Sequence, residues 1–302
     1  MSVAIPYVRE LNFEYGAMER VSPMIRRVIA RNPSGFTQHG TGTYVIGQGE
    51  VAVIDPGPLD MAHVRAIMDG LRGETITHIL ITHTHMDHSP ATAPLKELSN
   101  NPRSYGFGPH GVGKKVLVGQ SVEAGGDKDF VPDVTVRHGE VIRGKGWTFE
   151  CVHTPGHTSN HLCFGLREEK ALFTGDHVMG WSTTVISPPD GDMKDYMHSL
   201  EILLDRDDEI YWPTHGPAIR DPQNFVRAYI AHRHEREAQI MACLKEGVGR
   251  IADMVPVMYR DVDAKLWPAA GRSVLAHLLH MVDTGRAACE GEAGADSIYR
   301  AA

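Results

Sequence analysis

The residues most able to do chemistry in this 302-residue chain lie in one short segment, 83–88, which reads His-Thr-His-Met-Asp-His. The segment holds three imidazoles and one carboxylate, which are ligand types that zinc, iron and manganese accept. The chain has 18 histidines, so some clustering is expected by chance, but a solvated polar turn would not require this order. The pattern therefore predicts two metal half-sites built side by side.

The residues on either side of this segment predict a turn between a strand and a helix. Residues 77–82, Thr-His-Ile-Leu-Ile-Thr, are typical of a buried strand. Ser89 and Pro90 predict the start of a helix, with Ser89 as the N-cap and Pro90 in the first turn. At such a turn the side chains at alternate positions can converge on one point.

Three later positions could complete a metal site, and each follows an expected strand beside glycine or proline. His157 lies in Thr-Pro-Gly-His-Thr, Asp176 in Phe-Thr-Gly-Asp and His215 in Trp-Pro-Thr-His-Gly. Glycine next to a ligand allows the backbone to approach closely. Each of these residues alone would more often be a structural histidine or a turn carboxylate. The prediction depends on all three sharing one setting.

The rest of the pattern predicts strands alternating with helices. We expect helices over 59–71, 89–98 and 192–205, and loops over most of 100–132. We expect a hairpin and a strand within 41–55, followed by strands at 76–82, 115–118, 134–136, 147–153, 161–166, 171–174 and 209–212. Two similar halves of this kind indicate a layered α/β sandwich.

From Asp221 onward the pattern becomes helical, which predicts a separate C-terminal region. Helices are expected over 225–244, 251–259 and 264–282, and the small, polar tail over 290–302 is expected to fray. We therefore predict a catalytic domain over residues 1–219 and a helical appendage over 220–302.

Taken in order, these motifs resemble those of the metallo-β-lactamase superfamily, over about residues 20–218. Ile54-Asp55-Pro56-Gly57 is similar to the superfamily's early aspartate motif. The resemblance implies an αββα sandwich with the metals along one edge of its two sheets. It also implies the ligand sets: His83, His85 and His157 for one metal, Asp87, His88 and His215 for the other, Asp176 as the bridge, and Asp55 orienting ligands without binding metal.

The C-terminal region carries a second resemblance. Residues 231–237, Ala-His-Arg-His-Glu-Arg-Glu, together with 276–278, Ala-His-Leu, are similar to the winged-helix-like tail of one group in the superfamily. That group includes a mitochondrial endoribonuclease. The alternative is that these charges form a solvated helix face docked on the catalytic domain. Basic and acidic residues are equal in number from Arg220 to Ala302, whereas a winged helix that grips nucleic acid is usually basic.

Composition limits the partners and the compartment. The net charge of −8 argues against a nucleic-acid-binding surface over the whole molecule. No apolar run is long enough to span a membrane, and the first residues lack the design of a secretory signal. The four cysteines are not in CxxC spacing, so free thiols are expected. We expect a cytoplasmic protein with a small-molecule substrate, nucleic acid as the alternative partner, and a homodimer by default.

The expected reaction is hydrolysis. A hydroxide bridging two zinc ions would attack a small ester, thioester, lactone or phosphodiester, and Asp87 or Asp176 would orient it and take its proton. His161 is a candidate for holding substrate or donating a proton, with a structural hydrogen bond as the alternative. Zinc is preferred because all ligands are nitrogen or oxygen, and iron or manganese are the alternatives. Specificity is expected from segments 100–132 and 181–190 and from the C-terminal helices.

Several other functions stay open at this stage. They are an endoribonuclease acting on single-stranded RNA, an iron persulfide dioxygenase, a β-lactamase side activity and a non-catalytic nucleic-acid-binding regulator. His85 disfavours a flavodiiron-type oxidoreductase, which carries glutamate at that place. The C-terminal region offers no match to the basic glutathione-binding region expected of a glyoxalase II. The short spacings around Asp176 leave no room for the inserted cap of RNA-processing nucleases.

Overall fold

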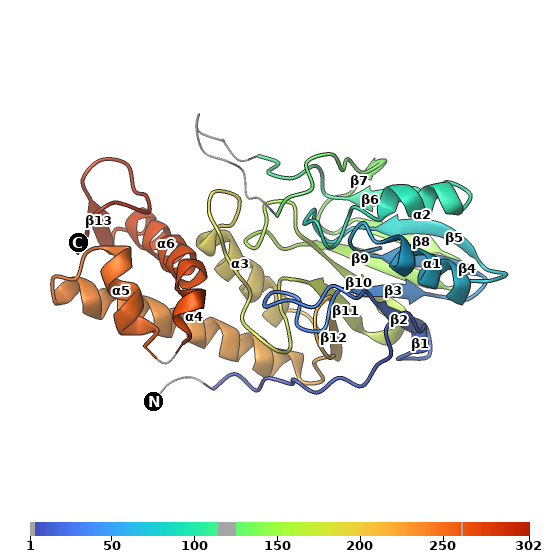
Figure 1. Ribbon diagram of the computed structural model, residues 1–302, viewed down its shortest axis with the longest axis horizontal. Helices are drawn as coiled ribbons and strands as arrows, with labels where there is room; N and C mark the ends of the chain where they lie inside the picture. Colours follow the sequence, from blue (N-terminus) through green and yellow to red (C-terminus); the bar gives the residue numbers. More distant parts are fainter. Residues whose placement is uncertain (1–3, 114–124, 261) are drawn as a thin grey trace.

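The computed structural model describes residues 4–113, 125–260 and 262–302, and in Figure 1 two sheets lie between outer helices. One sheet has seven strands in the order β1-β2-β3-β4-β5-β6-β7, and the other has five in the order β12-β11-β10-β9-β8. The strands of the first sheet are β1 Glu19–Arg20, β2 Ile25–Ile29, β3 Gly42–Ile46, β4 Glu50–Ile54, β5 Thr75–Leu80, β6 Arg103–Gly106 and β7 Val134–Thr135. Those of the second are β8 Val141–Gly144, β9 Trp147–His153, β10 Leu162–Leu166, β11 Ala171–Gly175 and β12 Ile210–Pro213.

The expected αββα sandwich is confirmed by where the buried residues lie. Side chains from the inner faces of both sheets, among them Tyr44, Phe149 and Phe173, form one core. A second core lies between the first sheet and helices α1 (Met61–Gly70) and α2 (Thr92–Leu98). A third joins the second sheet to α3 (Met193–Leu204) and α4 (Pro222–Lys245). Burial of these apolar side chains is the main force that holds the layers together.

Parallel pairing brings the ends of four strands to one edge of the sandwich. β4 pairs parallel with β5, and β11 pairs parallel with β12. Parallel strands end at the same edge, so the residues that follow them become neighbours. Asp55 follows β4, the segment 83–88 follows β5, Asp176 follows β11 and His215 follows β12. The resemblance to the superfamily implies metals along one edge of the two sheets, and these residues lie at this edge.

Several local predictions were wrong. Ser89 does not cap a helix: α2 begins at Thr92, and the Ser89 hydroxyl instead donates to Asp127 at 2.6 Å. Strand β6 lies within the segment expected to be loop, and strand β2 was not anticipated. The tail does not fray throughout, because Tyr299 is buried in β14 (Tyr299–Ala301), which pairs with β13 (Ala287–Cys289). The strand expected at 115–118 lies outside the described residues.

The C-terminal region is built from α4, α5 (Ile251–Met258) and α6 (Trp267–Asp283), followed by the β13–β14 hairpin. These elements share their own core, which includes Ile240, Met254 and Leu278. α4 contacts both α3 of the sandwich and α6 of the C-terminal region, and Figure 1 shows it running from one to the other. The boundary at residue 219 therefore stays a prediction. Among the described helices, none is both long and apolar enough to cross a membrane.

Candidate metal centre

The seven residues predicted as ligands converge on one place. Four of them lie on the turn after β5, and one each follows β9, β11 and β12. Their donor atoms form three overlapping groups in which all atoms lie within 4.8 Å of one another. The groups are His83/His85/His157, His83/His88/Asp176 and Asp87/His88/His215. The first and third groups consist of the same residues as the two ligand sets that the resemblance implies.

The first half-site consists of three imidazoles. Nδ1 of His85 lies 3.0 Å from Nε2 of His83 and 3.1 Å from Nε2 of His157. Nitrogens that share a tetrahedral zinc ion at its usual bond length lie roughly 3.3 Å apart. The three nitrogens are therefore close to the spacing that a metal ion requires.

The second half-site combines imidazole and carboxylate. Nε2 of His215 lies 3.1 Å from Oδ2 of Asp87, and Nε2 of His88 lies 3.5 Å from the same oxygen. Asp176 faces both half-sites, since Oδ1 is 3.3 Å from Nε2 of His215 and Oδ2 is 3.6 Å from Nε2 of His157. This placement fits the bridging position implied for Asp176.

The outward ring nitrogens of three ligands are anchored, which fixes their orientation. Nδ1 of His157 lies 2.6 Å from the Val185 carbonyl oxygen, and Nδ1 of His215 lies 3.2 Å from that of Gly40. Nδ1 of His88 lies 2.9 Å from Oδ2 of Asp55. Such partners hold each ring with Nε2 toward the metal position.

Asp55 is fully buried and accepts three further hydrogen bonds, two from Thr82 and one from Thr214. The Thr82 amide donates to Oδ1 at 2.8 Å, the Thr82 hydroxyl to Oδ2 at 2.7 Å and the Thr214 hydroxyl to Oδ2 at 3.0 Å. Its backbone has a φ of 47°, a conformation that aspartate tolerates better than most residues. Asp55 thus ties β4, β5 and the His215 loop together behind the residues that the resemblance implies as metal ligands.

The donor set fits a pair of divalent cations. Nε2 of His88 and Oδ1 of Asp176 are buried and have no hydrogen-bond partner among the described residues. Burial and the neighbouring His88 imidazole lower the pKa of His83, which keeps its lone pair available. Burial alone would raise the pKa of Asp176, but the imidazoles of His215 and His88 lower it by more. Burial alone would lower the pKa of His88 and of His215, but the neighbouring carboxylates of Asp87 and Asp176 raise both by more. A bound cation would take the place of these protons, because imidazole binds metal in its neutral form.

His161 is buried beside the centre and does not line the cleft. Its Nε2 accepts a hydrogen bond from the Asp176 amide at 3.2 Å, and its Nδ1 lies 2.9 Å from the Thr154 hydroxyl. With both nitrogens engaged, the geometry favours the structural alternative over proton donation. The carboxylates of Asp87 and Asp176 do reach the cleft, where their catalytic roles stay predictions.

A cleft of about 770 Å³ opens onto both half-sites. His85, Asp87, His157, Asp176 and His215 form its floor. Three parts of its walls belong to segments that were expected to set specificity: Gly125, the 182–189 loop and Arg272 of α6. The fourth part, residues 32–37, was not predicted from the sequence. The 32–37 segment carries no local signal, since only the fold brings it to the metal edge.

The 182–189 loop is held from behind by α4. The Arg233 guanidinium, which is buried, donates to the Thr184 carbonyl at 2.5 Å and lies over the Tyr196 ring. The Tyr229 hydroxyl donates to the carbonyl of Ser182 or of Met179. Part of the 231–237 motif is therefore built into the active-site wall, and is not simply a solvated helix face.

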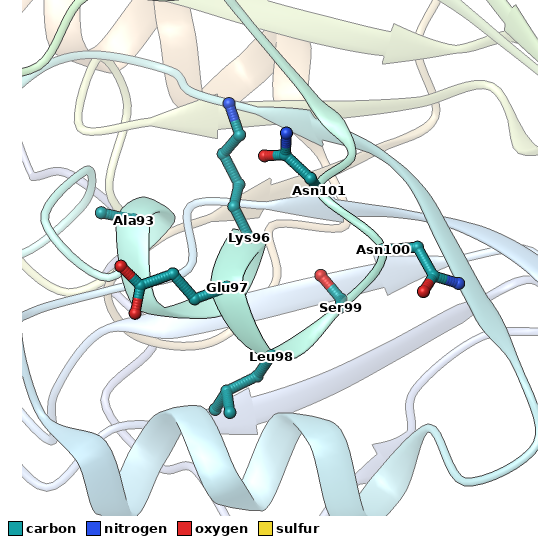
Figure 2. A pocket seen from close by; sticks show the side chains of 7 residues that line it. All are labelled: Ala93, Lys96, Glu97, Leu98, Ser99, Asn100 and Asn101. Atoms are coloured by element: carbon teal, nitrogen blue, oxygen red, sulfur yellow. The ribbon is translucent and has the colours of Figure 1, made fainter.

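A separate pocket of about 520 Å³ lies at the C-terminal end of α2 (Figure 2). It contains none of the predicted ligands, and its only basic lining residue, Lys96, is paired with Asp133 at 2.6 Å. This pocket offers no comparable chemistry, so we place the functional site at the metal edge. Its lining residues are Ala93, Lys96, Glu97, Leu98, Ser99, Asn100 and Asn101.

Comparison with known proteins agrees with the geometry. Residues 37–215 match the metallo-beta-lactamase superfamily, and residues 251–295 match the beta-lactamase associated winged helix domain. The chain is 31% identical over 287 residues to beta-lactamase-like protein 2 homolog of Drosophila melanogaster, covering 89% of this chain and 91% of that protein. It is 34% identical over 249 residues to atrochrysone carboxyl ACP thioesterase of Aspergillus chevalieri, covering 81% of this chain and 73% of that protein.

Solved structures share the whole architecture. A beta-lactamase domain protein from Burkholderia ambifaria superimposes with a TM-score of 0.79 at 21% identity, covering 95% of this chain and 94% of that one. A metallo-beta-lactamase family protein from Thermus thermophilus gives a TM-score of 0.74 at 20% identity, covering 94% of this chain and 100% of that one. At these identities the likeness establishes the fold, including the C-terminal region.

Proposed function

We propose that this chain is a thioesterase. The chain belongs to the metallo-beta-lactamase superfamily, carries the associated winged helix domain and is a metal-dependent hydrolase. The observation that carries the proposal is that both metal half-sites open into one cleft large enough for a small-molecule acyl group. Several relatives at 30–34% identity are named ACP thioesterases, which favours a thioester over the other bonds such a site could cleave.

We assign two zinc ions to the centre, because all ligand atoms are nitrogen or oxygen. Each half-site supplies three ligand residues, or four when Asp176 is counted with it. The first would be held by His83, His85 and His157, and the second by Asp87, His88 and His215. Asp176 would contact both. When bound, the ions supply an activated water and polarise the substrate carbonyl.

The chain's own carboxylates position the reaction. Asp87 is partly exposed on the floor of the cleft, and its Oδ2 accepts a hydrogen bond from the Thr41 hydroxyl at 3.3 Å. Neighbouring imidazoles lower the pKa of Asp87 despite its burial, so the carboxylate is ionised and can orient the attacking water. Asp176, opposite Asp87 across the second half-site, is the other acceptor for the proton released.

The chemistry of the leaving group suits this arrangement. A thiol has a pKa of about 8.5, so a thiolate departs near neutral pH without first being protonated. An alkoxide or amine leaving group would require a general acid, and the one proposed from sequence, His161, is buried with both nitrogens engaged. A thioester is therefore the bond whose cleavage at this site does not require a general acid.

A substrate panel tests the proposal. Purified protein with two equivalents of zinc is assayed on an acyl-pantetheine thioester, the matching oxygen ester, a lactone, a nitrophenyl phosphodiester and single-stranded RNA. The expected result is a kcat/KM for the thioester at least tenfold above that for the oxygen ester, with RNA uncut. RNA cleavage without thioester turnover would overturn the proposal in favour of an endoribonuclease.

A further inference from the structure

We propose that Arg272 is an anion-binding residue for the substrate, so that the preferred thioester carries a phosphate or carboxylate group. This inference deepens the proposed function and rests on it. Arg272 belongs to α6 of the winged-helix region, yet it lines the same cleft as the metal ligands of the sandwich. The cleft is thus completed by a positive charge from the other part of the chain.

The side chain of Arg272 is exposed, and its guanidinium has no counter-ion in the part of the chain that the structure describes. Within residues 4–113, 125–260 and 262–302, no hydrogen bond or ion pair involves it. It is also the one lysine or arginine among the described residues that line the cleft. The acidic residues of the lining, Asp87 and Asp176, face the metal positions instead. A guanidinium left open in this way can form paired hydrogen bonds to a carboxylate or phosphate.

The packing of α6 against α4 fixes where the backbone of Arg272 lies at the cleft. Glu237 of α4 is buried and lies 2.8 Å from Nδ1 of His280, and it also forms an ion pair with Arg286. The same α4 holds the 182–189 loop of the cleft through the hydrogen bond from Arg233 to the Thr184 carbonyl. One helix therefore fixes both the 182–189 loop and the helix that carries Arg272.

The anionic group that contacts Arg272 could belong to the thiol part or to the acyl part of the substrate, and the two can be distinguished. The phosphate of a phosphopantetheine arm lies on the thiol side of the thioester, whereas a carboxylate on the acyl group lies on the other side. Three thioesters distinguish them: acetyl-pantetheine, which is neutral, acetyl-pantetheine 4′-phosphate and succinyl-pantetheine. All three present the same bond to the metal centre.

The experiment compares wild type with Arg272→Ala, and with Arg300→Ala as the control. Arg300 is an exposed arginine of β14 that does not line the cleft. Arg272→Ala is expected to raise KM about tenfold for one anionic thioester, with less than a twofold change for acetyl-pantetheine. The anionic substrate affected identifies the source. Equal effects on all three thioesters, or no effect on any, would overturn the inference.

A binding measurement separates this inference from the proposed function. If the wild type cleaves no thioester, the thioesterase proposal fails, and calorimetry with pantetheine, its 4′-phosphate and succinate still decides the role of Arg272. The inference predicts that wild type binds one anionic ligand at least fivefold more tightly than Arg272→Ala does, while pantetheine binds both alike. Equal affinities for every ligand would refute it.

Discussion

Nδ1 of His157 lies 2.6 Å from the carbonyl oxygen of Val185, so a metal ligand of the sandwich is oriented by the loop that forms the cleft wall. That loop is in turn held by α4, because Arg233 donates to the carbonyl of Thr184, the residue before Val185. The Thr184 hydroxyl donates to the carbonyl of Asp176 or His177. Two of the metal ligands thus depend on a helix that continues into the C-terminal region.

Replacing Arg233 with methionine should weaken the first half-site. The loop carbonyl would lose its charged donor, and His157 would lose a fixed partner. Loss of partners that orient a ligand typically lowers metal affinity about 10- to 100-fold, and we expect the lower end because Arg233 acts through the loop. Competition with a zinc chelator measures the affinity. Arg227→Met, at an exposed position on the same helix, is the control, and equal affinities in both variants would refute the link.

Asp55→Asn should impair the second half-site. An amide cannot accept hydrogen bonds at both of its ends, so one of its partners, Thr82, Thr214 or His88, would be left unsatisfied in a buried place. We expect the zinc content after dialysis to fall from two ions per chain toward one, measured by elemental analysis. The exposed Asp69→Asn should retain both ions. Two tightly held ions in Asp55→Asn would contradict the role assigned to this carboxylate.

His161→Gln tests the choice between a structural and a catalytic histidine. The buried hydrogen bonds to Thr154 and Asp176 would be disturbed, at a loss of about 1–3 kcal/mol in the free energy of unfolding. The kcat at saturating thioester should change less than threefold, because the ring does not reach the cleft. Denaturant titration and steady-state kinetics give the two values. A hundredfold fall in kcat with an unchanged free energy of unfolding would show that His161 acts in catalysis, and would contradict the structural role.

The C-terminal region should lose stability in mild acid. Burial lowers the pKa of His277 to about 4, against an ordinary value near 6.5, and the nearby charges are Glu237, His280 and Arg233. Between pH 6.5 and 4, His277 is protonated in the unfolded chain but stays neutral in the folded chain. The free energy of unfolding therefore decreases as the pH drops toward 4.

The measurement is the free energy of unfolding between pH 6.5 and 4.5, for wild type and for His277→Gln. For each unit by which the pH falls, the free energy of unfolding of the wild type should decrease by about 1 kcal/mol more than that of His277→Gln, because glutamine takes up no proton on unfolding. The metal ligands titrate in both proteins, so their contribution cancels in the difference. Parallel pH profiles would show that His277 does not contribute.

The layers and the metal ligands could be predicted from sequence because both leave local signals. His83 to His88 lie on one turn, and His157, Asp176 and His215 each follow an apolar strand, so the pattern of strands already places them at sheet ends. Asp55 was identified through the resemblance of Ile54-Asp55-Pro56-Gly57 to the superfamily's early aspartate motif. These signals do not depend on knowing which strands pair.

Other features depend on contacts between distant segments and could not be predicted in this way. Ser89 has the residue type of an N-cap, but Asp127 takes its hydroxyl once the fold brings the two together. Arg272 is an ordinary helical arginine until α6 docks beside the metal edge. Tyr299 lies in a polar tail whose order comes from pairing between β13 and β14.

The most direct test of the account is thiol release from acyl-pantetheine as zinc is titrated into metal-free protein. The account predicts negligible activity without metal and a rise that levels off at two equivalents per chain, with His83→Ala inactive at every ratio. Full thioesterase activity in the metal-free protein, or in His83→Ala, would contradict the central claim that this His/Asp centre carries the hydrolysis.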